Sequence, residues 1–372
     1  MSMSAVEWKC LDEIAIVSIG EFVHKDKQNP NAEYPVYNGG ISNTGYYEDF
    51  NNTGNKIIIS ARGANAGYIN RVFVNYWAGN SCYSISVTSN DVDWNFLFYY
   101  LKTNQQKLIG EQQKGGIPAI SKRQICTFEI PIPSLAKQQE IVSHLDTFTS
   151  LISNLESELD MRRKQYEHYR NQLLDFEGVE GVEWKTLVEV GEFVRGNGIQ
   201  KKDFVEDGYG CIHYGQVYTQ FDLLAYETIT GIEKALYDKC RKAKCGDIVL
   251  ATTSENLEDV AKPVIWLGEE EIAVSGDAFI YKHNQNPIFM GSQFLTERFS
   301  KFKGMNAKGA KVIRITGDSM AEYKIALPSL EKQNEIAEGI KSFENLIQSL
   351  EQEIKLRKQQ YEYYREKLLT FE

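Results

Sequence analysis

The chain has 372 residues, of which 42% are hydrophobic and 25% charged, a balance that fits a globular protein with room for two domains. No apolar run approaches the ~20 residues of a membrane span. The N-terminus, MSMSAVEWKC, lacks the basic and apolar regions of a secretory signal. Six cysteines without a paired framework favour a reducing, cytoplasmic location, and the spacing of Cys240 and Cys245 is not that of a zinc knuckle. The net charge of −10 excludes a uniformly basic surface.

Residues 1–133 are expected to form a first mixed α/β domain. They open with VEWKCLDEIAIVSIGEFV from Val6, where we interpret Glu7-Trp8-Lys9 as the start of a strand. They end with IPIPSL, which leads into a long helix. Glycine-rich polar loops lie between these ends, in YPVYNGGISNTGYY and IIISARGANAGYI. Such loops allow backbone amides to approach a ligand closely.

The long helix is predicted over residues 134–177, with Ser134 as its N-cap after Pro133 and Gly178 at a C′ position. A helix of ~42 residues spans roughly 60 Å. Its apolar and aromatic residues recur at alternating spacings of four and three if Arg162 is included, which is typical of a coiled coil. They are Ile141, Leu145, Phe148, Ile152, Leu155, Leu159, Tyr166, Tyr169, Leu173 and Phe176.

The rest of the chain repeats this plan. Ile130 to Glu177 aligns without a gap onto Ile325 to Glu372, and half of the 48 positions are identical. A second opening, VEWKTLVEVGEFVRG, starts at Val182. Residues 178–328 are therefore expected to form a second domain and residues 329–372 a second helix. Because the stretches between the repeated ends share almost no residues, we predict one architecture that presents two different surfaces.

Each predicted helix has one apolar seam, so pairing of the two helices within the chain is the economical interpretation. Arg162 and Arg357 are the charged seam residues, at equivalent positions. Either their stems pack while their charged heads reach solvent, or they fix the register of the pair. The sequence also reads as a circle cut between the second helix and the first domain, so its two ends are expected to lie close together.

This order of domains and helices resembles that of type I restriction-modification specificity subunits, over essentially the whole chain. The repeated helix starts SLAKQQEI and SLEKQNEI are the most specific part. KGGIPAISKRQI and the two loops quoted above resemble recognition-domain segments of that family. So do CIHYGQVYT, GDIVLATTSENLEDVAK, GDAFIYKH and AKGAKVIRI in the second domain.

The resemblance implies an α+β fold in which two target-recognition domains are separated by two long helices, related by a pseudo-two-fold repeat. Each domain would read half of a bipartite DNA target, and the helices would form an antiparallel coiled coil that sets the spacing. It also implies modification subunits, two in number, that methylate adenine with S-adenosylmethionine, and a motor-nuclease subunit that uses ATP and Mg. This chain would have no cofactor, catalytic residue or membrane contact of its own.

Candidate DNA contacts combine arginine, lysine, amides, hydroxyls and tyrosines in loops, the side chains that suit phosphates and base edges. For the first domain they are Tyr37, Asn38, Ser42, Asn43, Arg62, Asn65, Lys114, Lys122 and Arg123. For the second they are Tyr214, Gln216, Tyr218, Thr219, Thr253, Ser254, Lys308, Lys311 and Arg314. The last three belong to a run, from Arg298 to Arg314, of six basic residues without an acid. Such a run is either a solvated face or a phosphate contact.

The candidate enzyme motifs in the sequence are incomplete. Asn286-Pro287-Ile288-Phe289 lacks the second proline of an adenine methyltransferase tetrad, and we interpret it as a turn before a helix. The segment from Gly304 to Lys311 resembles a phosphate-binding loop, but Ala310 stands where the lysine is needed. Two alternatives to a DNA reader stay open: a coiled-coil scaffold or adhesin with two ligand-binding domains, and a fused nuclease or methyltransferase, which the missing motifs disfavour.

Overall fold

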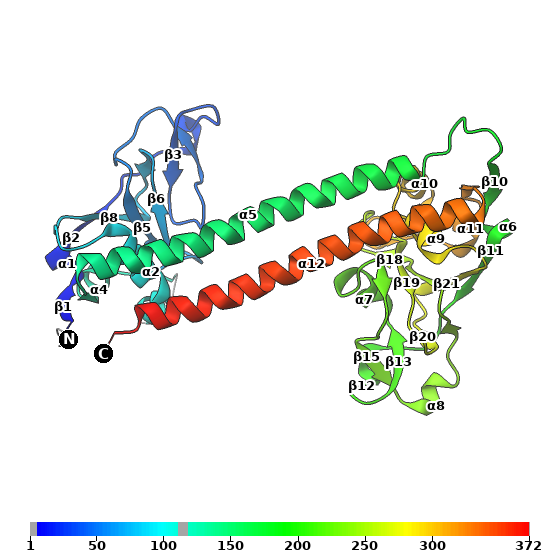
Figure 1. The fold of residues 1–372 in the computed structure, drawn as a ribbon. Helices are drawn as coiled ribbons and strands as arrows, with labels where there is room; N and C mark the ends of the chain where they lie inside the picture. The colour runs from blue at the N-terminus through cyan, green and yellow to red at the C-terminus, as the bar shows by residue number, and fades with distance from the viewer. Residues whose placement is uncertain (1–5, 111–117, 372) are drawn as a thin grey trace. The chain divides into compact units, whose positions relative to one another are not determined.

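The computed structural model describes residues 6–110 and 118–371, and the chain divides into two compact units (Figure 1). Unit 1 consists of Met1–Leu155 and Glu353–Glu372, and unit 2 of Glu156–Gln352. Each unit contains one mixed α/β domain and a stretch of both long helices. The two domains and two helices confirm the predicted fold class. None of the helices in the described part of the chain has the length and apolar content that a membrane crossing requires.

The first domain contains β1 Glu7–Cys10, α1 Leu11–Ile14, β2 Ala15–Ile19, a 3-10 turn Lys25–Lys27, β3 Tyr34–Tyr37, β4 Gly45–Tyr47, β5 Lys56–Ser60, β6 Ile69–Val72, β7 Trp77–Ala78, β8 Cys82–Val87, α2 Trp94–Thr103, α3 Gln105–Gly110, α4 Lys122–Cys126 and β9 Glu129–Ile132. Helix α5, Leu135–Leu173, follows.

The second domain contains β10 Glu183–Thr186, α6 Leu187–Val190, β11 Gly191–Arg195, a 3-10 turn Lys201–Asp203, β12 Phe204–Val205, β13 Tyr209–Ile212, α7 Tyr214–Thr219, β14 Leu224–Ala225, β15 Thr230–Ile232, α8 Lys234–Tyr237, β16 Lys242–Ala243, β17 Ile248–Ala251, β18 Thr253–Ser254, β19 Lys262–Trp266, β20 Ile272–Val274, β21 Ala278–His283, α9 Pro287–Gln293, α10 Glu297–Asn306, β22 Ile313–Arg314, α11 Gly317–Ala321 and β23 Lys324–Leu327. Helix α12, Leu330–Leu369, follows.

The first and last strands of each domain pair with one another. Strand β1 runs antiparallel to β9, with Trp8 opposite Pro131, and β10 runs antiparallel to β23, with Trp184 opposite Ala326. This clasp confirms that both VEWK segments start strands. It closes each domain at the point where its long helix begins.

The repeated Lys-Gln of the helix starts has a structural role. In unit 1, the side chain of Gln138 is fully buried, accepts from Asp93 N at 2.8 Å and donates to Asp91 O at 2.7 Å. In unit 2, Gln333 accepts from Asn286 N at 3.2 Å. Both glutamines also donate to the carbonyl oxygen of the nearby proline, Pro133 or Pro328. Each long helix is thereby tied to the loop that begins α2 or α9.

The helices pair in antiparallel fashion within each unit. In unit 1, the rings of Phe148 and Tyr364 stack at 5.5 Å. In unit 2, Tyr166 stacks on Phe343 at 5.9 Å, and Arg163 donates to Glu351 at 2.5 Å. These contacts confirm the predicted antiparallel coiled coil within each unit.

The first and last described segments of the chain both pack in unit 1. Leu11, near the start of the chain, and Leu369, near its end, belong to one hydrophobic cluster. Phe371 lies 6.1 Å from Phe96, ring to ring, in the same cluster. This proximity confirms the expected closeness of the ends, as far as the described residues go.

Both predicted N-caps are confirmed, since Ser134 Oγ accepts from Lys137 N at 3.4 Å and Ser329 Oγ from Lys332 N at 3.3 Å. The end of the first helix was predicted wrongly. Helix α5 stops at Leu173, and Gly178, with φ of +76°, lies in the following turn rather than at C′.

Near its end, α5 packs on two sides: the predicted seam residue Tyr169 stacks on Phe343 of α12 at 5.8 Å, and neighbouring residues are buried. Arg170 and Leu174 are buried there, whereas the predicted Tyr169 and Leu173 are more than a third exposed. Arg170 donates to the carbonyl oxygen of Leu295, which ties this part of α5 to the second domain.

The charged seam residues predicted from the sequence bond to side chains of their own helices. Arg162 donates to Glu158 and Gln165, and Arg357 donates to Glu353 and Gln360, so the two repeats use the same arrangement. This favours packed stems with charged heads held at the surface.

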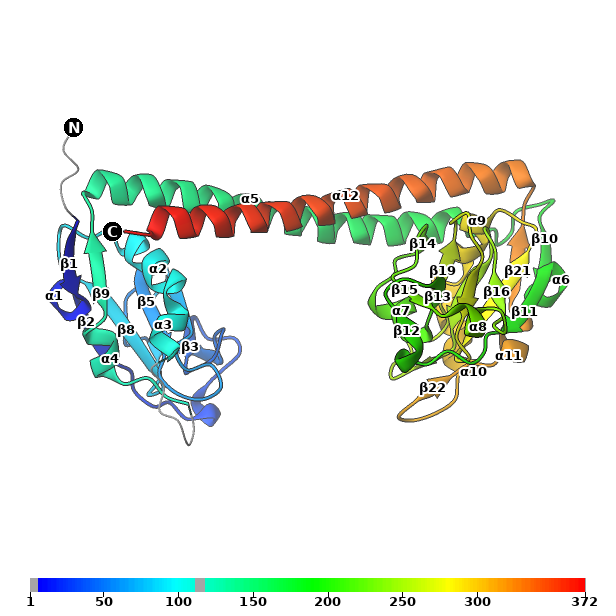
Figure 2. The same ribbon diagram turned by 90° about the horizontal axis from the view of Figure 1, so that it is seen from below.

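The two domains share a four-stranded antiparallel sheet despite their unlike sequences. Its order is β2-β8-β5-β6 in unit 1 and β11-β21-β17-β19 in unit 2, where β14 adds a fifth strand. Figures 1 and 2 show β5 and β8 side by side in the first domain and β19 and β21 in the sheet of the second. A smaller sheet adjoins it in each, built on a parallel pair, β3 with β7 or β13 with β20. The prediction of one architecture is confirmed.

Candidate nucleic-acid interface

Three backbone segments meet at one edge of unit 1. Ala61 N, just after β5, donates to Ser81 O at 2.8 Å, and Ala61 O accepts from Ile120 N at 2.9 Å. Arg62 forms an isolated antiparallel bridge with Ala119. The chain after β5, the turn before β8 and the segment before α4 are thus held together by main-chain bonds.

The same three bonds recur in unit 2. Thr252 N, just after β17, donates to Asp277 O at 3.1 Å, and Thr252 O accepts from Ile315 N at 3.2 Å. Thr253 pairs with Arg314 across β18 and β22. The backbones therefore match position by position, although the side chains do not.

The ends of β2 and β11 complete these edges, because Ile19 pairs with Tyr83 as Arg195 pairs with Phe279. We name four equivalent positions in each unit. Edge 1 is Ile19, Arg62, Ser81 and Ala119, and edge 2 is Arg195, Thr253, Asp277 and Arg314. Edge 1 has one charged residue and edge 2 has three. One frame thus presents different chemistry in each unit.

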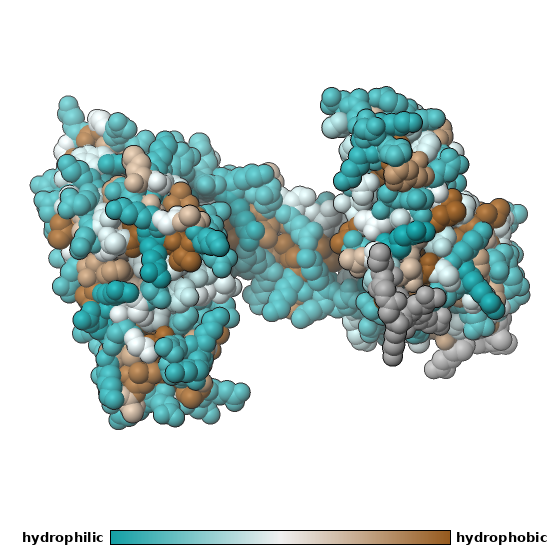
Figure 3. Space-filling model, turned by 180° about the vertical axis from the view of Figure 1, so that it is seen from behind, coloured by the Kyte–Doolittle hydropathy of each residue, from teal (hydrophilic) through white to brown (hydrophobic). Residues whose placement is uncertain are grey.

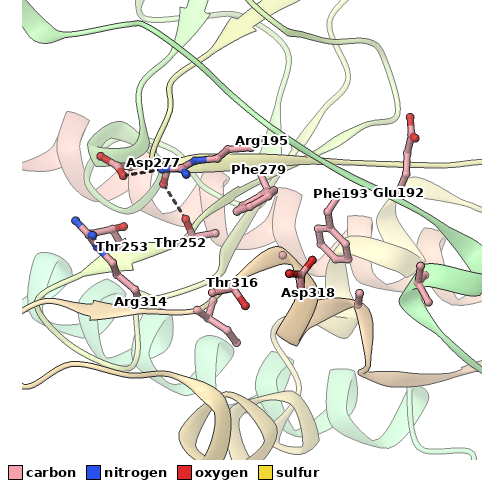
Figure 4. Close-up of a pocket in the computed structure, with 14 residues that line it drawn as sticks. Glu192, Phe193, Arg195, Thr252, Thr253, Asp277, Phe279, Arg314, Thr316 and Asp318 are labelled. Atoms are coloured by element: carbon pink, nitrogen blue, oxygen red, sulfur yellow. Dashed lines mark hydrogen bonds and ion pairs between the residues drawn. The ribbon is translucent and has the colours of Figure 1, made fainter.

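Edge 2 borders a cavity of about 460 Å³. Figure 4 shows Arg195, Asp277, Thr253 and Arg314 along one side of it and the Phe193 and Phe279 rings on another. The guanidinium of Arg195 lies 3.9 Å from the Asp277 carboxylate, and Arg195 Nε donates to Gly276 O at 2.8 Å. Of the predicted DNA contacts, Thr253 and Arg314 line this cavity.

The small sheets bring further candidates to the same regions. In unit 1, Asn38 follows β3 and its Oδ1 accepts from Ser81 N at 3.1 Å, while Ser60 Oγ donates to Gly40 O at 3.0 Å. Tyr37 is partly buried, and burial raises the pKa of its hydroxyl. Asn38 and Arg62 therefore converge on edge 1.

In unit 2, Tyr214 N donates to Ser275 Oγ at 2.8 Å, which places the start of α7 close to Asp277. The preceding His213 caps α7, with Nδ1 accepting from Gly215 N at 3.2 Å. Burial lowers the pKa of His213, so the ring is neutral and suited to accept this bond. The rings of Tyr214 and Tyr218 lie 6.4 Å apart, and burial raises the pKa of Tyr218.

Three candidates of the second domain form bonds inside it. Gln216 is 6% exposed, accepts from His213 N and donates to Thr230 Oγ1. Ser254 is 5% exposed and accepts from Asn256 N. Thr219 is exposed, but its hydroxyl donates to Gly215 O in its own helix at 2.6 Å. Burial makes Gln216 and Ser254 poor contacts for DNA, which is a correction to the sequence analysis.

The remaining candidates of the first domain lie around edge 1 or outside the described residues. Lys122 and Arg123 are exposed in α4, directly after Ile120. Ser42 is exposed, while Asn43 and Asn65 are half-buried in the loops after β3 and β5. Lys114 lies outside the described residues.

The basic run of the second domain does not form one face. Lys303 is 6% exposed and donates to Glu258 O and Val260 O, and burial lowers its pKa. Arg298 lies 4.0 Å from the ring centroid of Trp184. Lys308, Lys311 and Arg314 are exposed on the hairpin that leads to β22, where Lys308 bridges to Arg314. Lys303 is thus withdrawn from the cationic face predicted for the run, while the hairpin keeps its exposed cations.

Arg195 and Asp277 were not singled out from the sequence. Both lie in segments quoted there, VEWKTLVEVGEFVRG and GDAFIYKH, but no spacing brings them together.

On the side shown in Figure 3, hydrophilic residues predominate and hydrophobic ones form small separate patches. Such a surface suits nucleic-acid contacts, which are more polar than protein–protein contacts. Among the described residues, no cluster of histidine, cysteine and acidic side chains could hold a metal ion.

Comparison with known proteins gives one consistent result. The family model described as "Type I restriction modification DNA specificity domain" matches residues 3–161 and 180–356. The type I restriction enzyme EcoR124I/EcoR124II specificity subunit of Escherichia coli is 29% identical over 298 residues, which cover 77% of this chain and 73% of that protein.

Two solved structures share the fold. The crystal structure of a type I restriction-modification system S subunit from M. genitalium has a TM-score of 0.66 and 16% identity, covering 100% of this chain and 99% of that one. A chain from a structure titled for complex assembly and conformational transition of the type I R-M system has a TM-score of 0.59 and 14% identity, with coverages of 98% and 97%.

Proposed function

Because the chain belongs to the family of type I restriction-modification DNA specificity domains, we propose that it selects the DNA sequence on which a multi-subunit enzyme acts. The observation that carries this proposal is the pair of equivalent edges with unlike side chains. A protein that reads two different half-sites needs one scaffold used twice and two sets of base contacts. Edge 1 and edge 2 meet that need.

We propose that each domain reads one half of a bipartite target in double-stranded DNA. The candidates that support this are the exposed or half-buried groups around the two edges. In the first domain they are Tyr37, Asn38, Ser42, Asn43, Arg62, Asn65, Lys122 and Arg123; in the second they are Tyr214, Tyr218, Thr219, Lys308, Lys311 and Arg314. Thr253 is only 9% exposed, but it lines the cavity at edge 2. The paired helices then set the separation of the two half-sites and offer docking sites to modification subunits.

The chemistry is assigned to partner subunits. We propose two modification subunits that methylate adenine with S-adenosylmethionine, and a restriction subunit that uses ATP and Mg. The chain itself is proposed to be non-catalytic and to act in the cytoplasm, where its DNA substrate is found.

The test is co-expression of the chain with its modification subunits, followed by genome-wide mapping of methylated adenines. The expected result is a split motif of two short blocks around a fixed gap. Replacing residues 178–328 with the corresponding domain of a relative should change one block only. A continuous motif, or a change in both blocks, would contradict the assignment of one half-site to each domain.

The net charge of −10 makes a second measurement informative. Because affinity for DNA rests largely on neutralised phosphates, an acidic chain should bind weakly by itself. We expect affinity for a target duplex to rise sharply once modification subunits are added. Equal affinity in fluorescence anisotropy, with and without them at one salt concentration, would refute this expectation.

A further inference from the structure

Edge 2 contains an acidic and a basic side chain at the mouth of one cavity. The exposed fraction is 64% for the Arg195 side chain and 42% for that of Asp277, so both can reach a ligand. Their separation of 3.9 Å is long for an ion pair, and an exposed pair of this kind adds little to stability. The pair is thus available for another partner.

The backbone on which these two side chains stand is fixed. Arg195 is the last residue of β11 and pairs with Phe279 of β21. Its carbonyl oxygen accepts from Arg241 Nη1 at 2.9 Å. The carbonyl oxygen of Asp277 accepts two bonds from Thr252, one from N at 3.1 Å and one from Oγ1 at 3.2 Å. A site on rigid elements is preorganised for recognition.

The carboxylate identifies the part of DNA that fits. Asp277 would repel a phosphate, so a site built for the DNA backbone would not place it beside Arg195. In the major groove, the edge of cytosine presents an N4 amino group that donates to a carboxylate. The edge of guanine presents O6 and N7, which together accept from a guanidinium. An adjacent aspartate and arginine therefore match the two edges of one G·C base pair.

We propose that Arg195 and Asp277 read a single G·C pair in the half-site of the second domain, with Arg195 on guanine and Asp277 on cytosine. Thr253 and Arg314, opposite one another across β18 and β22, border the same cavity. The inference rests on the proposed function and adds to it a specific base pair and the two residues that discriminate it. Edge 1 has Ile19 and Ser81 at the equivalent positions, so the first domain lacks this pair.

The test uses the full complex of this chain with its modification subunits, and compares wild type with Asp277→Asn and Arg195→Ala. The block assigned to the second domain by domain exchange should contain a G·C pair. Each variant should accept other base pairs at that one position, where discrimination falls roughly 5- to 150-fold. The block of the first domain should not change.

The matched control is the exposed ion pair of Lys244 and Glu271, at 3.4 Å in the same unit. Lys244→Ala and Glu271→Gln should leave both blocks unchanged. Binding of duplexes that differ at single positions provides a second readout. The Asp277→Asn variant suits this measurement because it is nearly isosteric and should fold as the wild type does.

The possible failures are distinguishable. If the wild-type complex shows no split motif, the proposed function fails. If the motif is split but both variants retain it unchanged, or the second block has no G·C pair, the assignment of Arg195 and Asp277 is wrong. If Arg195→Ala weakens binding equally for all sequences and lowers the salt dependence, Arg195 contacts phosphate, which also overturns the inference.

Discussion

Unit 1 and unit 2 keep the same backbone bonds at their edges while changing nearly every side chain there. Edge 1 offers one cation and small or apolar neighbours, whereas edge 2 offers two arginines and an aspartate around a cavity. The main-chain bonds at Ala61 and Thr252 do not depend on side-chain identity, so they hold the frame constant. Recognition can then vary without cost to the fold.

The largest effect is expected in the hydrophobic cores, which are equivalent in the two domains. Phe96 and Phe289 occupy equivalent places, in the first turns of α2 and α9, and both are fully buried. Replacing either with alanine should destabilise its unit by about 3–5 kcal/mol, because a large cavity remains. Thermal or denaturant unfolding measures the effect, with exposed Phe22→Ala as control. A large loss for one phenylalanine and none for the other would show that the cores are not equivalent.

Acid is expected to destabilise unit 2 through one partly buried histidine that unit 1 lacks. His283 in β21 pairs with Gly191 as Val87 in β8 pairs with Ala15, so the titrating ring has a non-titrating equivalent. Burial lowers the pKa of His283 to about 4 from 6.5. The unfolded chain therefore takes up a proton first, and stability falls as pH drops from about 6.5 towards 4, by up to ~3 kcal/mol.

Unfolding free energies of wild type and His283→Val, compared across this pH range, measure the contribution of His283. The variant copies the residue of unit 1, so its stability should depend less steeply on pH. Identical pH profiles for the two proteins would rule out a contribution from this ring.

Recognition should respond at edge 1 as well. Arg62 stands where unit 2 has Thr253, and it is exposed. We expect Arg62→Thr to weaken discrimination in the block of the first domain by about 1–3 kcal/mol, since a bidentate arginine contact is lost. Methylation mapping in the full complex reads the change. Loss of selectivity in the block of the second domain would show that Arg62 does not read the half-site of the first domain.

The smallest effect is expected at the basic hairpin, which unit 1 does not match in its described residues. Lys308 and Lys311 are exposed on this hairpin. Replacing both with alanine should weaken binding of all sequences alike and lower the slope of affinity against salt by about 2. Anisotropy titrations at several salt concentrations measure this slope. An unchanged slope removes the hairpin from the phosphate contacts.

Sequence reasoning predicted the frame well, because repeated and periodic residues define it. The two VEWK strands, the N-caps Ser134 and Ser329, and Asn286 as a turn before a helix are all confirmed, the last by bonds from Ile288 N and Phe289 N to Asn286 Oδ1. These features depend on local geometry.

The edges could be predicted only in part, because tertiary bonds assemble them. Arg195 and Asp277 lie far apart in the sequence and meet through the pairing of β11 with β21. In the sequence Lys303 fits a cationic face, but in the fold its side chain donates to two buried carbonyl groups. Arg170 is buried beside Tyr169 because a carbonyl group between α9 and α10 accepts a bond from it, which no helical periodicity reports.

The clasp of β1 with β9, and of β10 with β23, bears on how such a chain can change in length. From Glu7 to Ile132 and from Glu183 to Leu327 the two inserts differ in size by 19 residues, yet both close in the same register, with the same antiparallel partners. Growth of a domain is thus absorbed between fastened ends and is not transmitted to the helix that follows. Residues inserted within a domain therefore leave the start of the following long helix in place.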